Sequence, residues 1–220
     1  MIKTVNKAVQ YFNFLTSLSP LACTYLRPSF SQFGEDRILD EHFRGVENGF
    51  YIEVGAYHPF CFSNSYLFYR KGWRGILVEP NPKSARLLKR WRKGDLVLET
   101  AVSTFEGSGE LTCDTTTSRL LAKEKNETTE HEIAKVQVCT LESILSRHAK
   151  GVKVDFLSID CEGHDLQCLE SNDWKKYRPR VVLAEELSAN PIRGRIVEYL
   201  QAEGYDLFAW AGPTLIFKEH

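Results

Sequence analysis

The stretch GFYIEVGAYHPFCFSNSYLFYRKGWRGILVEPNP, residues 49–82, decides the fold. Two short runs within it, FYIEV (50–54) and GILVE (75–79), are apolar on both faces, which is typical of buried parallel strands. Between them, Ser63 can cap a helix over the segment SNSYLFYRK. After them, Asn81 is followed by a proline and can cap the next helix. The stretch therefore predicts strands that alternate with helices around a mainly parallel sheet.

The same alternation continues to the end of the sequence. Asn190 and Gly204 bound one more predicted helix. The final two strands are joined by a tight Gly-Pro turn, so one of them should run antiparallel. The further predicted strands are DLVLETAV (95–102), VDFLSID (154–160), RVVLAEE (180–186), YDLFAW (205–210) and TLIFK (214–218).

The chain is predicted to form one domain over residues 31–220, preceded by a helical extension over residues 1–30. In the extension, Val5, Val9 and Phe12 recur at helical spacing. Its apolar stretch is too broken to span a membrane, and a signal peptide is the alternative interpretation. Residues 104–135 are polar and predict an insertion with one short strand near its start.

Composition limits the function classes. Lys and Arg total 28 and Asp and Glu total 29, so the net charge of −1 argues against nucleic-acid binding through bulk charge. The basic run at residues 89–93 is predicted to be the solvated end of a helix. The six cysteines form no CxxC pair, which favours a reduced, cytoplasmic protein.

Acidic residues and a glycine mark the ends of the first two strands. Glu53, Gly55 and Ala56 end the first strand, where the glycine lets a ligand approach the backbone. The loop lacks the GxGxxG pattern, which makes a dinucleotide less favoured than a smaller nucleoside cofactor. Glu79 ends the second strand 24 residues after Gly55 and can accept hydrogen bonds from ribose hydroxyls.

A third polar group follows the strand that ends in LSID. Asp160, Glu162 and His164 come directly after this apolar run. Helix capping explains either acid taken alone. The functional alternatives are ligation of a divalent metal by hard oxygen ligands and a general base that faces a substrate hydroxyl.

Three blocks of the sequence resemble the FkbM-type S-adenosylmethionine-dependent methyltransferases. They are SQFGEDRILDEHF (31–43), the opening stretch with GAYHP, SNSY, GWRG and EPNP in this order, and the block from residue 154 to 186 that contains IDCEG. The resemblance implies a class I methyltransferase-like, Rossmann-like α/β fold. Its sheet would have seven strands, with an antiparallel last strand and helices on both faces.

The resemblance also implies roles for individual residues. Glu53, Gly55 and Ala56 correspond to the cofactor loop, although aspartate is also common at position 53 in relatives, as it is at position 79. Glu79 corresponds to the ribose acid, and Ser103 lies where such enzymes contact adenine. Asp160, Glu162 and Gly163 correspond to the acidic motif beside the reacting centre.

The implied activity is O-methylation, by S-adenosylmethionine, of a hydroxyl on a sugar, a glycan precursor or a natural product, as in polysaccharide biosynthesis. His58, Asp160 and Glu162 are the candidate catalytic residues. In one version Asp160, Glu162 and His164 bind Mg²⁺, Mn²⁺ or Fe²⁺, which activates the hydroxyl. In the metal-free version Asp160 or His58 deprotonates it directly.

Three other functions remain open at this stage. One is a methyltransferase that acts on RNA or protein, and another is a catalytically inactive module that binds S-adenosylmethionine. An NAD-dependent oxidoreductase is disfavoured by the missing glycines. The oligomeric state is not predicted.

Overall fold

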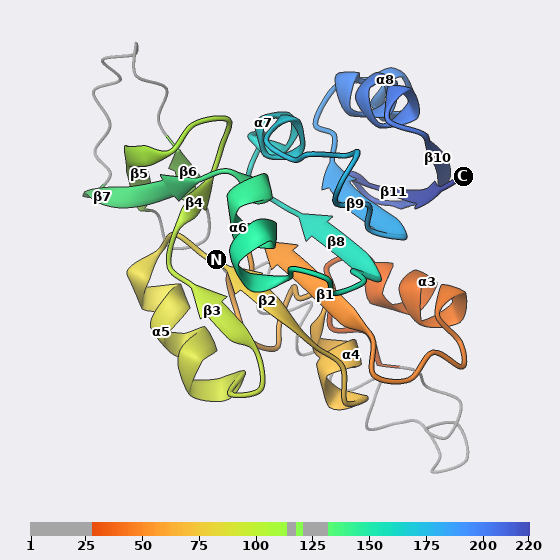
Figure 1. Cartoon of the computed structure of the whole chain (residues 1–220), viewed down its shortest axis with the longest axis horizontal. Helices are drawn as coiled ribbons and strands as arrows, with labels where there is room; N and C mark the ends of the chain where they lie inside the picture. The colour runs from red at the N-terminus through yellow and green to blue at the C-terminus, as the bar shows by residue number, and fades with distance from the viewer. Residues whose placement is uncertain (1–27, 114–117, 121–131) are drawn as a thin grey trace, which may run out of the picture.

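The computed structural model describes residues 28–113, 118–120 and 132–220 (Figure 1). The helical extension predicted for residues 1–30 lies almost entirely outside these ranges, as does the middle of the polar insertion. Within the described ranges, no helix combines the length and the apolar character needed to cross a membrane.

A seven-stranded sheet lies at the centre of the fold (Figure 1). Its strand order is β10-β11-β9-β8-β1-β2-β3. The strands from β9 to β3 pair in parallel, whereas β11 is antiparallel to both of its neighbours. This arrangement confirms the predicted seven-stranded sheet with an antiparallel last strand. The strands are β1 (Phe50–Val54), β2 (Arg74–Val78), β3 (Leu96–Leu98), β8 (Phe156–Ile159), β9 (Val181–Glu185), β10 (Tyr205–Ala211) and β11 (Thr214–Glu219).

Neighbouring residues of one strand face two different cores. In β1, Ile52 belongs to the core beneath α6, α7 and α8, whereas Tyr51 belongs to the core beneath α3, α4 and α5. In β8, Leu157 and Phe156 divide in the same way. Both faces are therefore covered by helices, as the apolar character of the strands predicts. The helices are α3 (Glu35–His42), α4 (Tyr66–Arg70), α5 (Pro82–Trp91), α6 (Leu141–His148), α7 (Asp165–Glu170) and α8 (Arg195–Ala202).

Side-chain caps account for the starts of α5 and α6, at Asn81 and Thr140. The Asn81 side chain accepts a hydrogen bond from the backbone N–H two residues on, at 2.9 Å, as its position before proline predicts. The predicted helix after Asn190 begins with the 3₁₀ turn η1 (Pro191–Arg193), and α8 starts only after Gly194. The Glu186 carboxylate packs closely against this glycine. A Cβ added at Gly194 would lie 2.1 Å from one of its oxygens.

The polar insertion forms a second sheet instead of a loop with one short strand. The strand predicted over residues 95–102 divides into β3 and β4, because β4 pairs with β7 of this second sheet. The sheet has the order β4-β7-β5-β6 and its own small apolar core around Leu111 and Val138. Its strands are β4 (Ala101–Val102), β5 (Gly107–Cys113), β6 (Ser118–Leu120) and β7 (Glu132–Cys139).

A buried arginine joins three parts of the chain. Arg92 follows α5, and its side chain is fully buried. Its guanidinium donates to Asp95 at 2.9 Å and to the Tyr51 hydroxyl at 2.9 Å. It also donates to the Ser65 hydroxyl at 2.7 Å and to the backbone oxygen of Pro59 at 3.2 Å. Arg92 therefore ties β1, the segment after β1 and the turn before β3 together.

We expect the Arg92→Met variant to lower the free energy of unfolding by about 3–5 kcal/mol. The substitution leaves the Asp95 carboxylate buried without its cation, and such groups are costly. The matched control is Lys89→Met, since the ion pair of Lys89 with Glu99 is exposed and should contribute less than about 1 kcal/mol.

Urea denaturation of both variants measures this difference. The double variant Arg92→Met/Asp95→Asn should lose less stability than the sum of the two single variants, because the residues are in direct contact. An Arg92→Met variant no less stable than Lys89→Met would contradict this role of the buried pair.

Candidate cofactor and catalytic site

A cavity of about 300 Å³ lies at the carboxyl ends of β1, β2 and β8. This is the edge of an open α/β sheet where ligands bind, and the volume is at the lower end of the range for small-molecule sites. The residues that follow these strands line it, including Gly55, Glu79 and Asp160. Leu111 and Leu120 of the second sheet line it as well.

The loops after β1 and β8 touch directly at Gly55. Its φ is 80°, a left-handed conformation that favours glycine. A Cβ at this position would lie 1.8 Å from the backbone oxygen of Asp160. The glycine predicted to let a ligand approach therefore also lets these two loops pack together.

Glu79 connects the loops after β1 and β2. One carboxylate oxygen accepts from the backbone N–H of Tyr57 at 2.8 Å, and the other accepts from that of Asn81 at 2.7 Å. Burial raises the pKa of Glu79, and the two N–H bonds oppose this shift. Since a carboxylate can accept about four hydrogen bonds, both oxygens keep capacity for a ligand in the cavity.

Two predicted cofactor residues lie behind the loop and do not line the cavity. Glu53 accepts from the Ser63 hydroxyl at 3.1 Å, from the backbone N–H of Asn64 at 2.7 Å and from the Ser65 hydroxyl. Burial raises the pKa of Glu53, opposed by the nearby Arg92. Ala56 is buried in the core beneath α3, α4 and α5. Glu53 and Ala56 therefore lie behind the loop after β1, where their side chains offer a ligand in the cavity no polar contact.

Ser103 also lies behind a residue of the cavity wall. It is buried, and its hydroxyl is 3.0 Å from Nε2 of His164, which lines the cavity. The predicted contact of Ser103 with adenine is therefore not favoured by this geometry. Val102, the residue before it, lines the cavity instead.

Asp160 lines the cavity from the end of β8. Its carboxylate makes no hydrogen bond within the described residues, and it lines the cavity together with Glu162. Burial raises the pKa of Asp160 to about 7, and the neighbouring carboxylates of Glu185 and Glu162 raise it further. A carboxyl group that titrates near neutral pH is suited to accept and release protons there.

Two more acids titrate at the same pH beside Asp160. Burial is the main cause that raises the pKa of Asp165 and of Glu185 to about 7, and nearby carboxylates contribute to both shifts. Asp165 accepts from the backbone N–H groups of Cys161 at 3.2 Å and Glu185 at 3.0 Å. Sequence analysis assigned no role to either residue, although Asp165 directly follows His164 and Glu185 ends β9.

His58 is not placed as the predicted base. Its Nδ1 accepts from the backbone N–H groups of Phe60 at 3.3 Å and Cys61 at 3.1 Å, so this nitrogen is engaged within its own loop. The ring is not among the residues that line the cavity.

The predicted metal site is not formed. In the described ranges, no three His, Cys, Asp or Glu side chains are grouped so that they could hold a metal ion. Asp160 and Glu162 do line the cavity, but Nε2 of His164 is engaged with the Ser103 hydroxyl. The metal-assisted version of the mechanism is therefore withdrawn.

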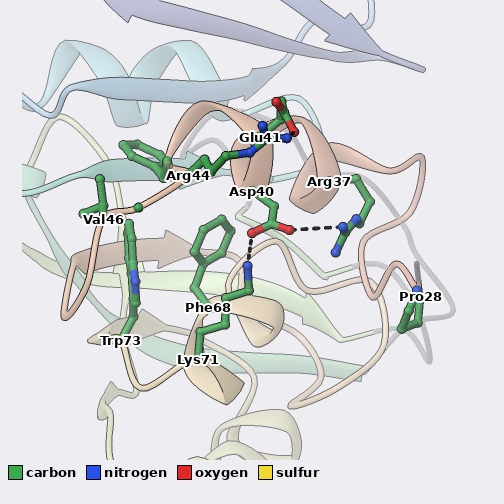
Figure 2. A pocket seen from close by; sticks show the side chains of 11 residues that line it. Pro28, Arg37, Asp40, Glu41, Arg44, Val46, Phe68, Lys71 and Trp73 are labelled. Atoms are coloured by element: carbon green, nitrogen blue, oxygen red, sulfur yellow. Dashed lines mark hydrogen bonds and ion pairs between the residues drawn. The ribbon is translucent and has the colours of Figure 1, made fainter. Parts of the chain in front are cut away.

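A second hollow lies at the opposite edge of the sheet (Figure 2). It has a volume of about 730 Å³ and is lined by the ends of α3 and α4 and by Trp73, which precedes β2. Asp40 lies at its centre between Arg37 and Lys71 and forms ion pairs with both (Figure 2). Because its cations are already paired and it lies at the amino ends of the strands, we do not assign the site there.

The geometry implies that Asp160 lowers stability where it is charged. Its pKa is raised in the folded state, so the folded protein holds a proton between about pH 4 and pH 7 that the unfolded chain has lost. Stability is therefore lost as pH rises through this window. The Asp160→Asn variant should increase the free energy of unfolding by about 1–3 kcal/mol at pH 8 and change it little at pH 4.

Urea denaturation at the two pH values measures this effect. Glu170→Gln is the matched control, since Glu170 is an exposed acid outside the cluster and should show no such pH dependence. An equal effect of Asp160→Asn at both pH values would show that the raised pKa is wrong.

Comparisons with known proteins identify the family of the chain. The model of the methyltransferase FkbM domain matches residues 53–207. No curated protein matches the chain at a significant level. Among solved structures, a TehB-like SAM-dependent methyltransferase from Corynebacterium glutamicum is 11% identical with a TM-score of 0.45, and the match covers 100% of this chain and 99% of that one.

Two other solved structures are similar at the same level. The 1,6-didemethyltoxoflavin-N1-methyltransferase from Burkholderia thailandensis, solved with S-adenosylhomocysteine, is 12% identical with a TM-score of 0.43 over 98% of this chain and 89% of that one. The precorrin-6y C5,15-methyltransferase from Geobacter metallireducens is 9% identical with a TM-score of 0.44 over 84% and 87%.

Proposed function

The chain belongs to the FkbM methyltransferase family, and on this premise we propose that it moves a methyl group from S-adenosylmethionine to a hydroxyl of a sugar, a glycan precursor or a similar small molecule. The observation that carries the proposal is the pair of acids in one cavity. Glu79 faces it from the end of β2, and the unpartnered Asp160 faces it from the end of β8.

The residues present fit S-adenosylmethionine. Glu79 would accept hydrogen bonds from the ribose hydroxyls, because each of its oxygens holds only one N–H. Val102, Leu111 and Leu120 supply an apolar wall suited to the adenine base. Because Gly55 has no side chain, the backbone of the loop after β1 borders the cavity directly.

Asp160 is proposed as the general base. When bound, the cofactor supplies an electrophilic methyl group on a positively charged sulfur. The Asp160 carboxylate would take the proton of the acceptor hydroxyl as the hydroxyl oxygen receives the methyl group from the sulfur. With a pKa of about 7, a large share of Asp160 is deprotonated at neutral pH, and such bases contribute about 10²–10⁴-fold in rate.

The charge at the reacting edge favours a small hydroxyl acceptor over RNA. Asp160, Glu162 and Glu185 gather there, and the groups that shift the pKa values of Asp160 and Glu185 are all carboxylates. A phosphate next to the methylated group would be repelled by these acids. The alternative of RNA as acceptor is therefore the less favoured one.

We expect Glu79→Ala to weaken the binding of S-adenosylhomocysteine about 10- to 150-fold, since a hydrogen bond to a charged acceptor is worth about 1.5–3 kcal/mol. Isothermal titration calorimetry measures the affinity. For the unchanged protein, S-adenosylhomocysteine at a hundred times its dissociation constant should stabilise the fold by about 2.7 kcal/mol. The control variant Glu99→Ala removes an exposed acid that pairs with Lys89. It should bind S-adenosylhomocysteine with the affinity of the unchanged protein.

Equal affinity of the Glu79→Ala and unchanged proteins would show that the ribose is not held at this residue. A fold stabilised by NAD and not by S-adenosylhomocysteine would contradict the methyltransferase assignment itself.

Methyl transfer is tested by mass spectrometry of sugar nucleotides, oligosaccharides and other hydroxylated acceptors incubated with the protein and S-adenosylmethionine. We expect a mass gain of one methyl group that persists after chelation of metals. Its rate should rise with pH through about 7, because the base must lose its proton first. The Asp160→Asn variant should lose about 10²–10⁴-fold in kcat and retain cofactor affinity.

The variant should also lose the rise of the rate near pH 7. If Asp160→Asn turned over at the normal rate with the normal pH profile, the base would have to be another residue. Transfer to nitrogen or to RNA alone would contradict the hydroxyl acceptor.

A further inference from the structure

A strip of aromatic rings leads away from the cavity over the segment after β1 and the helices α4 and α5, which cover the same face of the sheet (Figure 1). We infer that this strip binds the non-reacting part of an oligosaccharide acceptor that carries anionic groups away from the methylated hydroxyl. The inference rests on the proposed function for the nature of the acceptor. The aromatic strip consists of Tyr57, His58, Phe60, Tyr66, Tyr69 and Trp91.

The strip starts at the cavity and is continuous. Tyr57 lines the cavity, and its ring centroid lies 6.2 Å from that of His58. The next ring, Phe60, follows at 5.7 Å from His58. Phe60 then contacts two further rings, Tyr66 at 5.0 Å and Trp91 at 5.5 Å. A ligand that leaves the cavity past Tyr57 therefore meets one aromatic ring after another.

The rings of the strip are accessible to a ligand. The Trp91 side chain at the end of α5 is 50% exposed, and the other members are half-buried. Tryptophan and tyrosine are enriched where one partner binds another, because they offer a large rigid face together with a polar group. Sugar rings present flat faces of C–H groups that pack on aromatic rings, which suits a saccharide chain.

Three exposed arginines flank the strip. The guanidinium carbon of Arg90 lies 5.6 Å from the ring centroid of Trp91, and that of Arg74 lies 4.8 Å from Tyr69. Arg70 lies 5.5 Å from Phe30, whose ring contacts Tyr66 at 4.8 Å. None of the three forms an ion pair with a carboxylate in the described part of the chain.

Guanidinium groups held over aromatic rings keep N–H donors for a carboxylate or a phosphate. The flank of the strip is thus positive and able to pair with an anionic ligand.

The charge along the path changes sign. The reacting edge holds Asp160, Glu162 and Glu185, whereas the far end of the strip holds the arginines. The complementary ligand is neutral where it is methylated and anionic further along. RNA carries a phosphate at every nucleotide and does not match this pattern. An oligosaccharide with uronate or phosphorylated sugars away from its reacting end does.

Fluorescence anisotropy with three labelled probes of matched length tests the inference on the full chain. The probes are an oligogalacturonate, a neutral maltooligosaccharide and an oligouridylate. We expect the oligogalacturonate to bind most tightly and to weaken with added salt. Trp91→Ala and Arg90→Gln should each reduce its affinity about tenfold, as expected for loss of an exposed aromatic or arginine contact.

Two variants outside the strip are matched controls. Trp210→Ala removes a tryptophan that is 61% exposed on β10, and Arg195→Gln removes an exposed arginine of α8. Both should bind the oligogalacturonate within about twofold of the unchanged protein, since they leave the strip intact. Calorimetry with S-adenosylhomocysteine on every variant shows that each is folded and that the cavity is intact.

Three outcomes would overturn the inference. They are no binding of the oligogalacturonate, equal losses in the controls and the strip variants, and tighter binding of the oligouridylate. The last outcome would assign the strip to nucleic acid. The test uses binding and not turnover, so a protein that binds the oligogalacturonate at the strip but methylates no hydroxyl would contradict the proposed function alone.

Discussion

The site depends on the hydrogen bonds that the fully buried guanidinium of Arg92 donates. It donates to Tyr51 on β1, to Ser65 in the segment after β1 and to Asp95 before β3. Ser65 in turn donates to Glu53, so the charge of the arginine also opposes the cost of burying that acid. The loop that carries Gly55 and Tyr57 is thereby fixed from behind by charged hydrogen bonds, and its cavity side stays free. Such a support holds a binding loop in place without using the groups that bind.

On the other side of the loop after β1, where Gly55 packs against Asp160, acidic side chains gather without the pairing that Arg92 has. Asp160, Asp165 and Glu185 lie close together with no compensating cation among the described residues, and the pKa of each is raised to about 7. Replacing these acids by neutral groups would increase the free energy of unfolding. For Asp160, which lines the cavity, this cost is the one expected of the proposed general base. Stability and reactivity are thus supplied by different groups on either side of one loop.

Much of the fold followed from local pattern, and less of the site did. Strands such as FYIEV are buried on both faces, so their apolar pattern and their ends were visible in the sequence. Gly55, Glu79 and Asp160 were found because the carboxyl ends of parallel strands meet at one edge. The engagement of His58 could not be predicted, since it depends on backbone N–H donors of its own loop. The place of Glu53 behind the loop was equally hidden, because Arg92, whose charge opposes the cost of burying this acid, is distant in sequence.

The second sheet separates two tasks of the enzyme. Leu111 and Leu120 form part of the cavity wall, yet their strands β5 and β6 pair only within the four-stranded sheet. Substitutions in these strands can reshape the wall without shifting the register of the seven strands that carry the acids. The molecule is therefore modular in an evolutionary sense. Cofactor fit and the rate of product exchange can drift through changes in the insertion, while the proton-transfer chemistry stays under separate selection.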